Sequence, residues 1–442
     1  MALTKVNTRM IDGDATSVLD YGAVADGTTD NSAAFQSAID YVTGLTGGGS
    51  VYVPQGIYLI DAQVNLKDNV KVYGVGTIKA GASIKDTSDG YFQANGTDCL
   101  LEGLTFDGDT ARTQTCNFDP DGLSGGTCYG IFILCQGSPK VEIRECTFKN
   151  VGKDAVYVGF NTSTGEACGD CLITENNISE CHRSGITLEG FRSAIVTNNI
   201  ITDIYEGSID LEVDDKTPDN QGVNAIISFN HIGVTNQTDR ADKNQQRIDV
   251  TNQETGGDAI SNVVLQGNTI YDYWETVDTA RTDGLELIDI TTQNCRVTVQ
   301  GNVLRTNAVT SSASGLLNIN GGSYVQTGGN LVEYFGSDTS DSGTYGVLGG
   351  IMATSTPNNY ITIGDDRVLG NIDRAVYIRN CDSVKIDGTI IKTATTALAG
   401  VYTDACTNLI ITNCIIDDAS RAVYLKDTTT VMLQDSVFTP NA

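Results

Sequence analysis

The stretch Asn198-Asn199-Ile200 closes a short run of β-branched residues, and its pattern of Asn, any residue and an aliphatic residue recurs along the 442-residue chain. The other occurrences are Asn176-Asn177-Ile178, Asn230-His231-Ile232, Asn268-Thr269-Ile270, Asn302-Val303-Leu304, Asn330-Leu331-Val332 and Asn413-Cys414-Ile415. Up to Asn330, successive spacings run from 22 residues (176 to 198) to 38 residues (230 to 268), which fits one coil of a solenoid plus a variable loop. Asn tolerates the left-handed conformation of a tight corner, and stacked Asn side chains can bond to one another. The repeat therefore predicts an asparagine ladder along one corner of a solenoid.

Between these Asn repeats lies a second set of predicted strands, in which apolar and polar residues alternate. They are Ala155-Val156-Tyr157-Val158, Gly185-Ile186-Thr187-Leu188, Ser208-Ile209-Asp210-Leu211, Arg247-Ile248-Asp249-Val250, Gly284-Leu285-Glu286-Leu287, Ala375-Val376-Tyr377-Ile378 and Ala422-Val423-Tyr424-Leu425. Alternation of period two indicates that one side of each strand is buried and the other solvated. The main alternative is a β-propeller, which needs a steadier period of about 40–50 residues. We therefore predict an all-β fold, a right-handed parallel β-helix.

One helix is expected near the amino terminus. Asp30-Asn31-Ser32 can cap it, and residues 33–43 carry apolar side chains at helical spacing. Gly47-Gly48-Gly49 ends the helix, and Val51-Tyr52-Val53-Pro54 begins the first coil. A short helix at this position is expected to cap the open end of the solenoid, as a terminal repeat must.

Charge and hydropathy exclude several classes of partner. With 27 basic and 55 acidic residues, the formal net charge is −28, so nucleic acid and anionic membrane surfaces are unfavourable partners. No run of 18 apolar residues is present, so no membrane insertion is expected. The segment from Met1 to Val6 does not have the features of a secretory signal peptide.

Twelve cysteines are spread along the chain, several of them at inward strand positions. Cysteines at such positions are usually small core residues. Cys168, Cys171 and Cys181 form the one candidate cluster, for which a zinc site or a disulfide are the alternatives to free thiols.

Two blocks resemble a known family. Residues 18–31, VLDYGAVADGTTDN, and residues 48–58, GGSVYVPQGIY, resemble the opening of the pectate-lyase-like β-helix superfamily. The resemblance implies a β-helix domain over residues 18–442, preceded by a leader or attachment segment over residues 1–17.

A narrower resemblance lies just ahead of these blocks. Residues 4–13, TKVNTRMIDG, are similar to the leader of bacteriophage tail spikes and tail fibres. That resemblance implies a homotrimer in the virion tail, in contact with other virion tail proteins and with host surface polysaccharide. Together with the absence of a signal peptide, it implies a virion-borne, extracellular location.

The outward strand positions supply a candidate site. If Ile209, Ile248 and Leu285 point inward, the following residues form an outward acidic column, and residues two positions further form a second one. The candidate catalytic residues are Asp210, Glu212, Asp249, Glu189 and Glu286. The candidate substrate-binding residues are Tyr157, Phe160, Phe191, Trp274 and Arg247. Carboxylates this close repel one another, so that one is expected to have a raised pKa and to act as an acid.

Three functions remain open at this stage. Glycoside hydrolysis needs a pair of carboxyl groups, which the column supplies. A polysaccharide lyase or epimerase needs a base and a cation, and Arg183, Arg192 or Arg247 could serve as an arginine base. The Asp-Pro-His motif of alginate epimerases and the Gly-His-Gly motif of polygalacturonases are both missing. A glycan-binding adhesin or structural tail component without catalysis is the third possibility, and the same acids could also bind Ca²⁺.

Overall fold

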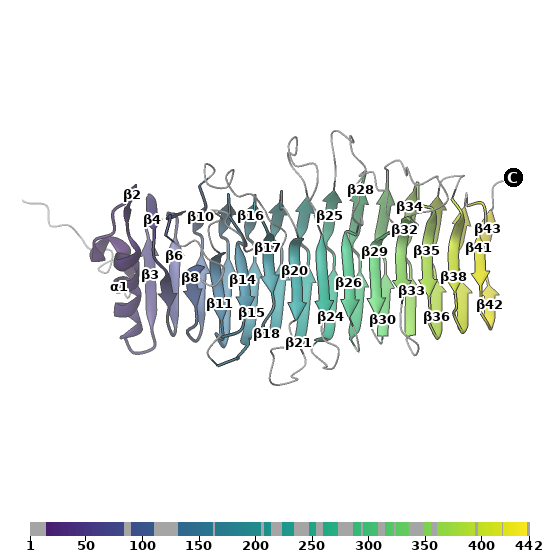
Figure 1. Cartoon of the computed structure of the whole chain (residues 1–442), viewed down its shortest axis with the longest axis horizontal. Helices are drawn as coiled ribbons and strands as arrows, with labels where there is room; N and C mark the ends of the chain where they lie inside the picture. Colours follow the sequence, from purple (N-terminus) through teal and green to yellow (C-terminus); the bar gives the residue numbers. More distant parts are fainter. Residues whose placement is uncertain are drawn as a thin grey trace, which may run out of the picture. The chain divides into compact units, whose positions relative to one another are not determined.

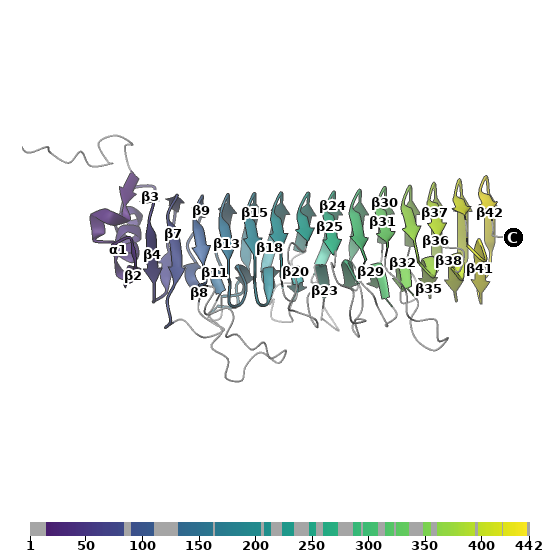
Figure 2. The same cartoon turned by 90° about the horizontal axis from the view of Figure 1, so that it is seen from above.

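A computed structural model describes residues 15–83, 90–109, 131–161, 164–204, 207–213, 223–233, 247–252, 260–272, 286–292, 295–307, 314–321, 324–335, 348–354, 360–393, 397–417 and 419–439. The chain divides into two compact units. The first unit is Met1–Ile201 with Lys216–Asp219, and the second is Thr202–Asp215 with Asn220–Ala442. Each unit is built from coils of short strands that contribute in turn to three sheets, here named A, B and C (Figures 1 and 2).

In the first unit, neighbouring strands of each sheet come from successive coils, and every pairing is parallel. Sheet A consists of β1 (Ala15–Ser17), β3 (Gly49–Val53), β6 (Val70–Gly74), β9 (Cys99–Glu102), β12 (Lys140–Arg144), β15 (Cys168–Thr174) and β18 (Phe191–Thr197). Sheet B consists of β2 (Asp26–Asp30), β4 (Ile57–Ile60), β7 (Thr77–Ala80), β10 (Thr105–Asp107), β13 (Thr147–Lys149) and β16 (Asn177–Ser179). Sheet C consists of β5 (Val64–Leu66), β8 (Gly90–Ala94), β11 (Ile131–Gln136), β14 (Val156–Gly159) and β17 (Ser184–Leu188). The chain passes into the second unit within β19 (Ile200–Thr202).

The second unit repeats this plan with parallel pairing throughout. Sheet A consists of β21 (Val223–Ser228), β24 (Ile260–Gln266), β27 (Arg296–Gln300), β30 (Tyr324–Gly328), β33 (Tyr360–Gly364), β36 (Ser383–Asp387), β39 (Asn408–Thr412) and β42 (Val431–Gln434). Sheet B consists of β22 (His231–Gly233), β25 (Thr269–Asp272), β28 (Val303–Thr306), β31 (Leu331–Tyr334), β34 (Arg367–Gly370), β37 (Ile390–Thr393), β40 (Ile415–Asp417) and β43 (Val437–Thr439). Sheet C consists of β20 (Gly207–Val213), β23 (Ile248–Asn252), β26 (Ile288–Thr292), β29 (Ser314–Gly321), β32 (Leu348–Thr354), β35 (Arg374–Arg379), β38 (Ala399–Asp404) and β41 (Val423–Lys426). The predicted parallel β-helix is confirmed.

The amino-terminal helix is also confirmed, as α1 (Ser32–Thr43), and it follows a 3-10 turn, η2 (Val18–Tyr21). The Asp30 carboxylate accepts a hydrogen bond from the backbone N–H of Ser32 at 3.0 Å, which satisfies one free donor of the first turn. Phe35 is fully buried and packs edge-on against Tyr58 at 5.7 Å and Phe92 at 6.2 Å. The helix therefore covers the interior of the first coils, as predicted. Strand β1 lies within the segment that we assigned to the leader.

The asparagine ladder is present in both units. In the second unit, the Nδ2 group of Asn268 donates to Oδ1 of Asn302 at 3.0 Å and to the carbonyl of Ile227 at 2.8 Å. Asn302 bonds to Asn330 in the same way, and Asn330 bonds to Asp366, which takes the next ladder position. Because each side-chain amide bonds to the coils on both sides, the column satisfies buried donors and fixes the stacking of the coils.

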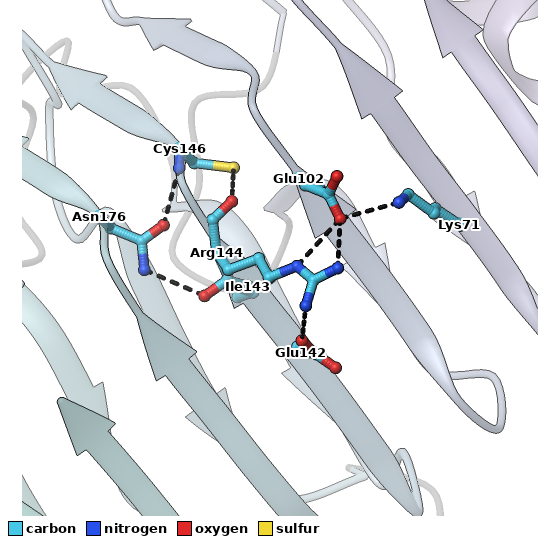
Figure 3. Close-up of polar contacts among 7 residues, drawn as sticks. All are labelled: Lys71, Glu102, Glu142, Ile143, Arg144, Cys146 and Asn176. Carbon is cyan, nitrogen blue, oxygen red and sulfur yellow. Dashed lines mark hydrogen bonds and ion pairs between the residues drawn. The ribbon is translucent and has the colours of Figure 1, made fainter. Parts of the chain in front are cut away.

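In the first unit, Asn176 occupies the same position. Its Oδ1 atom accepts from the backbone N–H of Cys146 at 3.0 Å, and its Nδ2 group donates to the carbonyl of Ile143 (Figure 3). Asn199 continues this ladder by accepting from Asn176 at 3.0 Å.

Two details of the predicted corner are wrong. The residue in the left-handed conformation precedes the ladder residue, as with Asn198 (φ 56°) before Asn199. Asn413 is likewise in the left-handed region (φ 54°) and exposed, while Cys414 takes the buried position. The repeats that we aligned at Asn198 and Asn413 are therefore shifted by one residue from the buried ladder positions, which are Asn199 and Cys414. The two roles separate because a left-handed residue turns the chain, whereas only the next residue points into the coil stack.

Candidate functional site

An acidic column follows the outward side of sheet C in the second unit. Ile209, Ile248 and Ile288 are paired and fully buried, so the next residue of each strand points outward. Those residues are Asp210, Asp249 and Asp289, paired in register on β20, β23 and β26. Adjacent strands lie about 4.8 Å apart, so the column brings three carboxyl groups together on one face.

The predicted position of Glu286 in this column is wrong. The strand that we placed at residues 284–287 begins instead at Ile288, and Asp289 is the residue that pairs with Asp249. Glu286 lies just before β26, close enough to raise the pKa of Asp249 by charge repulsion. Asp289 had a usable signal, because Ile-Asp-aliphatic recurs at residues 209–211, 248–250 and 288–290.

The pKa of Asp249 is more strongly perturbed than that of Asp289. Its side chain is almost fully buried, and its carboxylate forms an ion pair with the guanidinium of Arg247. Burial, together with the nearby charges of Asp289 and Glu286, raises the pKa of Asp249 to about 7, although Arg247 acts in the opposite direction. This carboxyl group can therefore carry a proton near neutral pH, as a general acid must.

Asp289 is held in a more polar environment. Burial raises its pKa above the ordinary value, while a hydrogen bond from Asn318 Nδ2 at 2.9 Å and the charge of Arg247 lower it. Asn318 occupies the outward position that pairs with Asp289 on the next strand, β29. Asn318 was not among the predicted site residues. Beside the column, Glu212 is half-buried and pairs with Thr251, so the second outward column carries one acid here rather than several.

A separate polar cluster lies on sheet C of the first unit. The hydroxyl of Tyr157 donates to the carboxylate of Glu189, and burial together with this bond raises the pKa of Tyr157. The guanidinium of Arg183 lies 5.3 Å from the Tyr157 ring centroid and binds the fully buried carboxylate of Asp154 through both oxygens. The backbone N–H of Ser184 also donates to Asp154 at 3.0 Å. The structure places Glu189 and Tyr157 in the first unit and the other described acidic candidates in the second.

Two of the predicted sugar-stacking aromatics are not available for stacking. Phe191 is among the largest fully buried side chains, and only 8% of Phe160 is exposed. The prediction for these two residues is wrong, because the chain folds both rings into the interior. Trp274 lies outside the described residues, whereas Tyr157 and Arg247 are half-buried.

The described part of the chain offers no group of three or more His, Cys, Asp or Glu side chains placed to hold a metal ion. The cysteines within it are free and buried; Cys116 and Cys128 lie outside the described residues. Among the described helices, none is long and apolar enough to cross a membrane.

Two family models match the chain. The model described as rhamnogalacturonase A/epimerase, pectate lyase-like, matches residues 15–209, and the model of the right-handed beta helix region matches residues 316–442. Both matched families are pectate-lyase-like or right-handed β-helix families, in agreement with the fold described above.

Phage proteins are among its relatives in sequence. The tail spike protein of Shigella phage Sf6 is 34% identical over 153 residues, which cover 33% of this chain and 23% of that protein. The preneck appendage protein of Bacillus phage PZA is 25% identical over 417 residues, which cover 79% of this chain and 47% of that protein. The chain thus spans less than half the length of either curated relative.

Solved structures agree on the fold. The A-module of mannuronan C-5 epimerase AlgE6 from Azotobacter vinelandii superposes with a TM-score of 0.57 at 14% identity, covering 97% of this chain and all of that one. The N-terminal fragment of gene product 12 of bacteriophage Phi29 has the same TM-score and identity, covering 94% of this chain and 65% of that one. At such identity the likeness concerns the fold alone.

Proposed function

We propose that this chain is a phage virion protein that binds a host surface polysaccharide and hydrolyses it on sheet C of the second unit. The observation that carries the proposal is Asp249, a buried carboxyl group paired in register with Asp289 and with a pKa raised to about 7. Two carboxyl groups in unlike environments are the arrangement that glycoside hydrolysis requires.

The environments suggest one role for each carboxyl group. Asp249 is the proposed acid, because it is the more strongly perturbed of the two and can hold a proton near neutral pH. Asp289 is the proposed nucleophile, because the Asn318 amide and the Arg247 charge favour its ionised form. Neighbouring strands lie about 4.8 Å apart, close to the ~5–5.5 Å separation typical of retaining enzymes.

The remaining acids would act around this pair. Asp210 flanks Asp249 on the side opposite Asp289, and Glu286 lies close enough to repel its charge. A pair formed by Asp210 and Asp289 would be two strands apart, about 9.6 Å, which is near the range for inversion. Product stereochemistry therefore separates the two possible pairs. The proposed chemistry needs no metal ion, because carboxyl groups alone supply the acid and the nucleophile.

The similarity to the Sf6 tail spike and to the PZA appendage protein supports a virion location. Their names place them in phage tails and appendages, and we extend that location to this chain as part of the proposal. A homotrimer and contacts with other tail proteins belong to the same proposal.

A polysaccharide lyase is the second candidate, favoured by the cluster in the first unit. There Tyr157, Glu189 and Arg183 place a phenol, a carboxylate and a cation within a few ångströms. A lyase requires a proton-accepting group and a cation to stabilise the charge that develops next to the sugar carboxylate. Sequence similarity to alginate lyase 7 of Azotobacter vinelandii, 31% identical over 153 residues, also favours it.

The test is product analysis on purified capsular and lipopolysaccharide glycans from a panel of bacterial strains. Hydrolysis produces new reducing ends without ultraviolet absorbance, whereas a lyase also produces an absorbing unsaturated sugar. Anomeric NMR of the fresh product should show retention if Asp249 and Asp289 act together. Glycans that are retained on the immobilised protein but never shortened would contradict hydrolysis and support the adhesin.

A further inference from the structure

The outward face of sheet A in the second unit is almost free of charge. Residues that point inward alternate with residues that point outward in the strands from β21 to β42. The inward residues are Ala225, Val263, Val297 and their partners on later strands. The outward residues from β24 to β39 are Asn262, Val264, Gln266, Arg296, Thr298, Gln300, Tyr324, Gln326, Gly328, Tyr360, Thr362, Gly364, Ser383, Lys385, Asp387, Asn408, Ile410 and Thr412. We name this surface the sheet A face.

Charge is rare on the sheet A face, and part of it is neutralised. Its charged residues between β24 and β39 are Arg296, Lys385 and Asp387, and Lys385 binds Asp387 at 2.7 Å. The formal net charge of the whole chain is −28. Sheet C of the same unit instead presents Asp210, Asp249 and Asp289 outward. Between β24 and β39 the sheet A face of the second unit therefore presents one acidic side chain, Asp387, and Lys385 neutralises it.

Large apolar side chains are exposed on the same face. Tyr324 is 53% exposed and Tyr360 is 56% exposed, and their rings stack at 5.4 Å with an interplanar angle of 6°. Arg296 lies 6.0 Å from the ring centroid of Tyr324. Ile410 is also exposed, as are Ile226 on β21 and Met432 on β42, the first and last strands that the second unit contributes to sheet A (Figure 1). Stacked tyrosines, a neighbouring arginine and further exposed apolar side chains on one face are the composition typical of protein interfaces.

We propose that the sheet A face of the second unit is the surface through which copies of this chain associate with one another. Protein interfaces are enriched in Tyr, Met and Arg and depleted of Lys, Glu and Asp, which describes this face. Two copies that each carry a charge of −28 repel over most of their surfaces, so contact is least costly where acids are absent.

A second copy fits this surface better than a sugar chain does. The phenol rings could stack on sugars, but Ile226, Ile410 and Met432 offer nothing to a ligand rich in hydroxyl groups. Burying these side chains against another apolar surface stabilises a complex by about 25 cal/mol per Å². Identical copies with matching faces form closed symmetric assemblies, and the native mass gives the number of copies. The inference does not depend on the proposed glycan hydrolysis.

The test is light scattering coupled to size exclusion, with native mass spectrometry of the full chain, over a range of protein concentrations. The wild type should give a multiple of the 46.9 kDa monomer. In the double variant Gln326→Glu with Thr362→Glu, two carboxylates lie side by side on β30 and β33. Like charges facing each other across a contact cost several kcal/mol, so the dissociation constant should rise about 100-fold or more.

The matched control is the double variant Thr269→Glu with Val303→Glu. It places two carboxylates side by side on β25 and β28 of sheet B, and it should keep the wild-type mass. Melting temperatures of both variants check that the fold survives. A wild type that is monomeric at every concentration would overturn the inference. So would an oligomer that persists in the sheet A variant, or one that only the sheet B variant dissociates.

Discussion

Glu102 in the first unit and Asp249 in the second are both carboxyl groups on outward strand positions beside an arginine, yet their surroundings act in opposite directions. Glu102 accepts from Lys71 Nζ at 2.8 Å and from Arg144 at 2.9 and 2.6 Å (Figure 3). Burial opposes its ionisation, but these two cations outweigh it, and the pKa of Glu102 is lowered. Asp249 is more deeply buried, has one arginine and repels other acids, so that its pKa is raised.

The comparison shows that an outward carboxylate in a solenoid is not functional by position alone. The pKa of such a carboxyl group depends on the balance between its burial, the number of nearby cations and the number of neighbouring acids. Two cations keep the Glu102 carboxylate ionised, and their ion pairs link neighbouring coils. Asp249 has one cation within a buried acidic column, so its carboxyl group can hold and release a proton near neutral pH. Four predictions test this contrast.

The largest effect is expected on activity. Asp249→Asn should lower kcat on a cleaved polysaccharide about 100- to 10,000-fold, because the amide cannot donate the proton that a general acid supplies. The matched change Glu102→Gln should leave kcat within about twofold. Reducing-end assays on both variants, with circular dichroism as a check on folding, make the comparison. Equal activity of wild type and Asp249→Asn would remove Asp249 from the mechanism.

The next effect is on stability as a function of pH, and the two residues should show opposite signs. The folded-state pKa of Asp249 is raised, so its contribution to stability is fully present below about pH 4 and is lost as pH rises through about 7. Asp249→Asn should therefore gain free energy of unfolding relative to wild type over that range, on the order of 4 kcal/mol at most.

For Glu102 the pKa is lowered, so its contribution is present above its ordinary pKa and is lost as pH falls. Glu102→Gln should be less stable than wild type at neutral pH, and the deficit should shrink below about pH 4.5. Urea denaturation at a series of pH values measures both variants. If the difference in free energy of unfolding between variant and wild type changed with pH in the same direction for Asp249→Asn and Glu102→Gln, the contrast between the two residues would be contradicted.

A smaller effect is expected when each arginine is removed. Arg247→Met should raise the pKa of Asp249 further, by about one unit, since the charge and hydrogen bond of Arg247 lower it. Arg144→Met should raise the pKa of Glu102 by less, because Lys71 remains. NMR titration of carboxyl carbons gives both values. A larger shift at Glu102 than at Asp249 would show that the remaining lysine does not compensate.

The smallest effect concerns the outer member of the first-unit network. Glu142 accepts from Arg144 at 2.9 Å across a partly exposed pair. Glu142→Gln should therefore change the free energy of unfolding by less than about 1 kcal/mol, as is typical of surface ion pairs. Thermal unfolding of this variant beside Glu102→Gln makes the comparison, and a loss above that figure would mean that the network acts as one unit.

Much of the fold could be predicted because its signals are local. Alternation of apolar and polar residues specifies which side of a strand is buried, and the residues of α1 carry their own cap and apolar stripe. The ladder positions Asn268, Asn302 and Asn330 were predicted from the recurring pattern of Asn, any residue and an aliphatic residue, although the left-handed residue at each corner is the preceding Gly.

The site was predicted only in part, because its members come from different coils. Asp210 and Asp249 were placed correctly side by side, but Asp289 was missed and Glu286 took its place. The spacing between successive coils varies along the chain, so spacing alone does not set the register of the next strand. The burial of Phe191 was not predicted because Phe191 begins β18 and does not follow the alternation of that strand, in which the next buried residues are Ala194 and Val196.

The amino-acid sequence by itself determined the parallel β-helix, its amino-terminal cap and its asparagine corner, because these depend on short-range alternation and on backbone conformations that single residues prefer. Only the tertiary structure decided which outward residues become neighbours and how deeply each is buried. Hydrogen bonds between coils set that register, and burial with the local count of charges then separates Asp249 from Glu102.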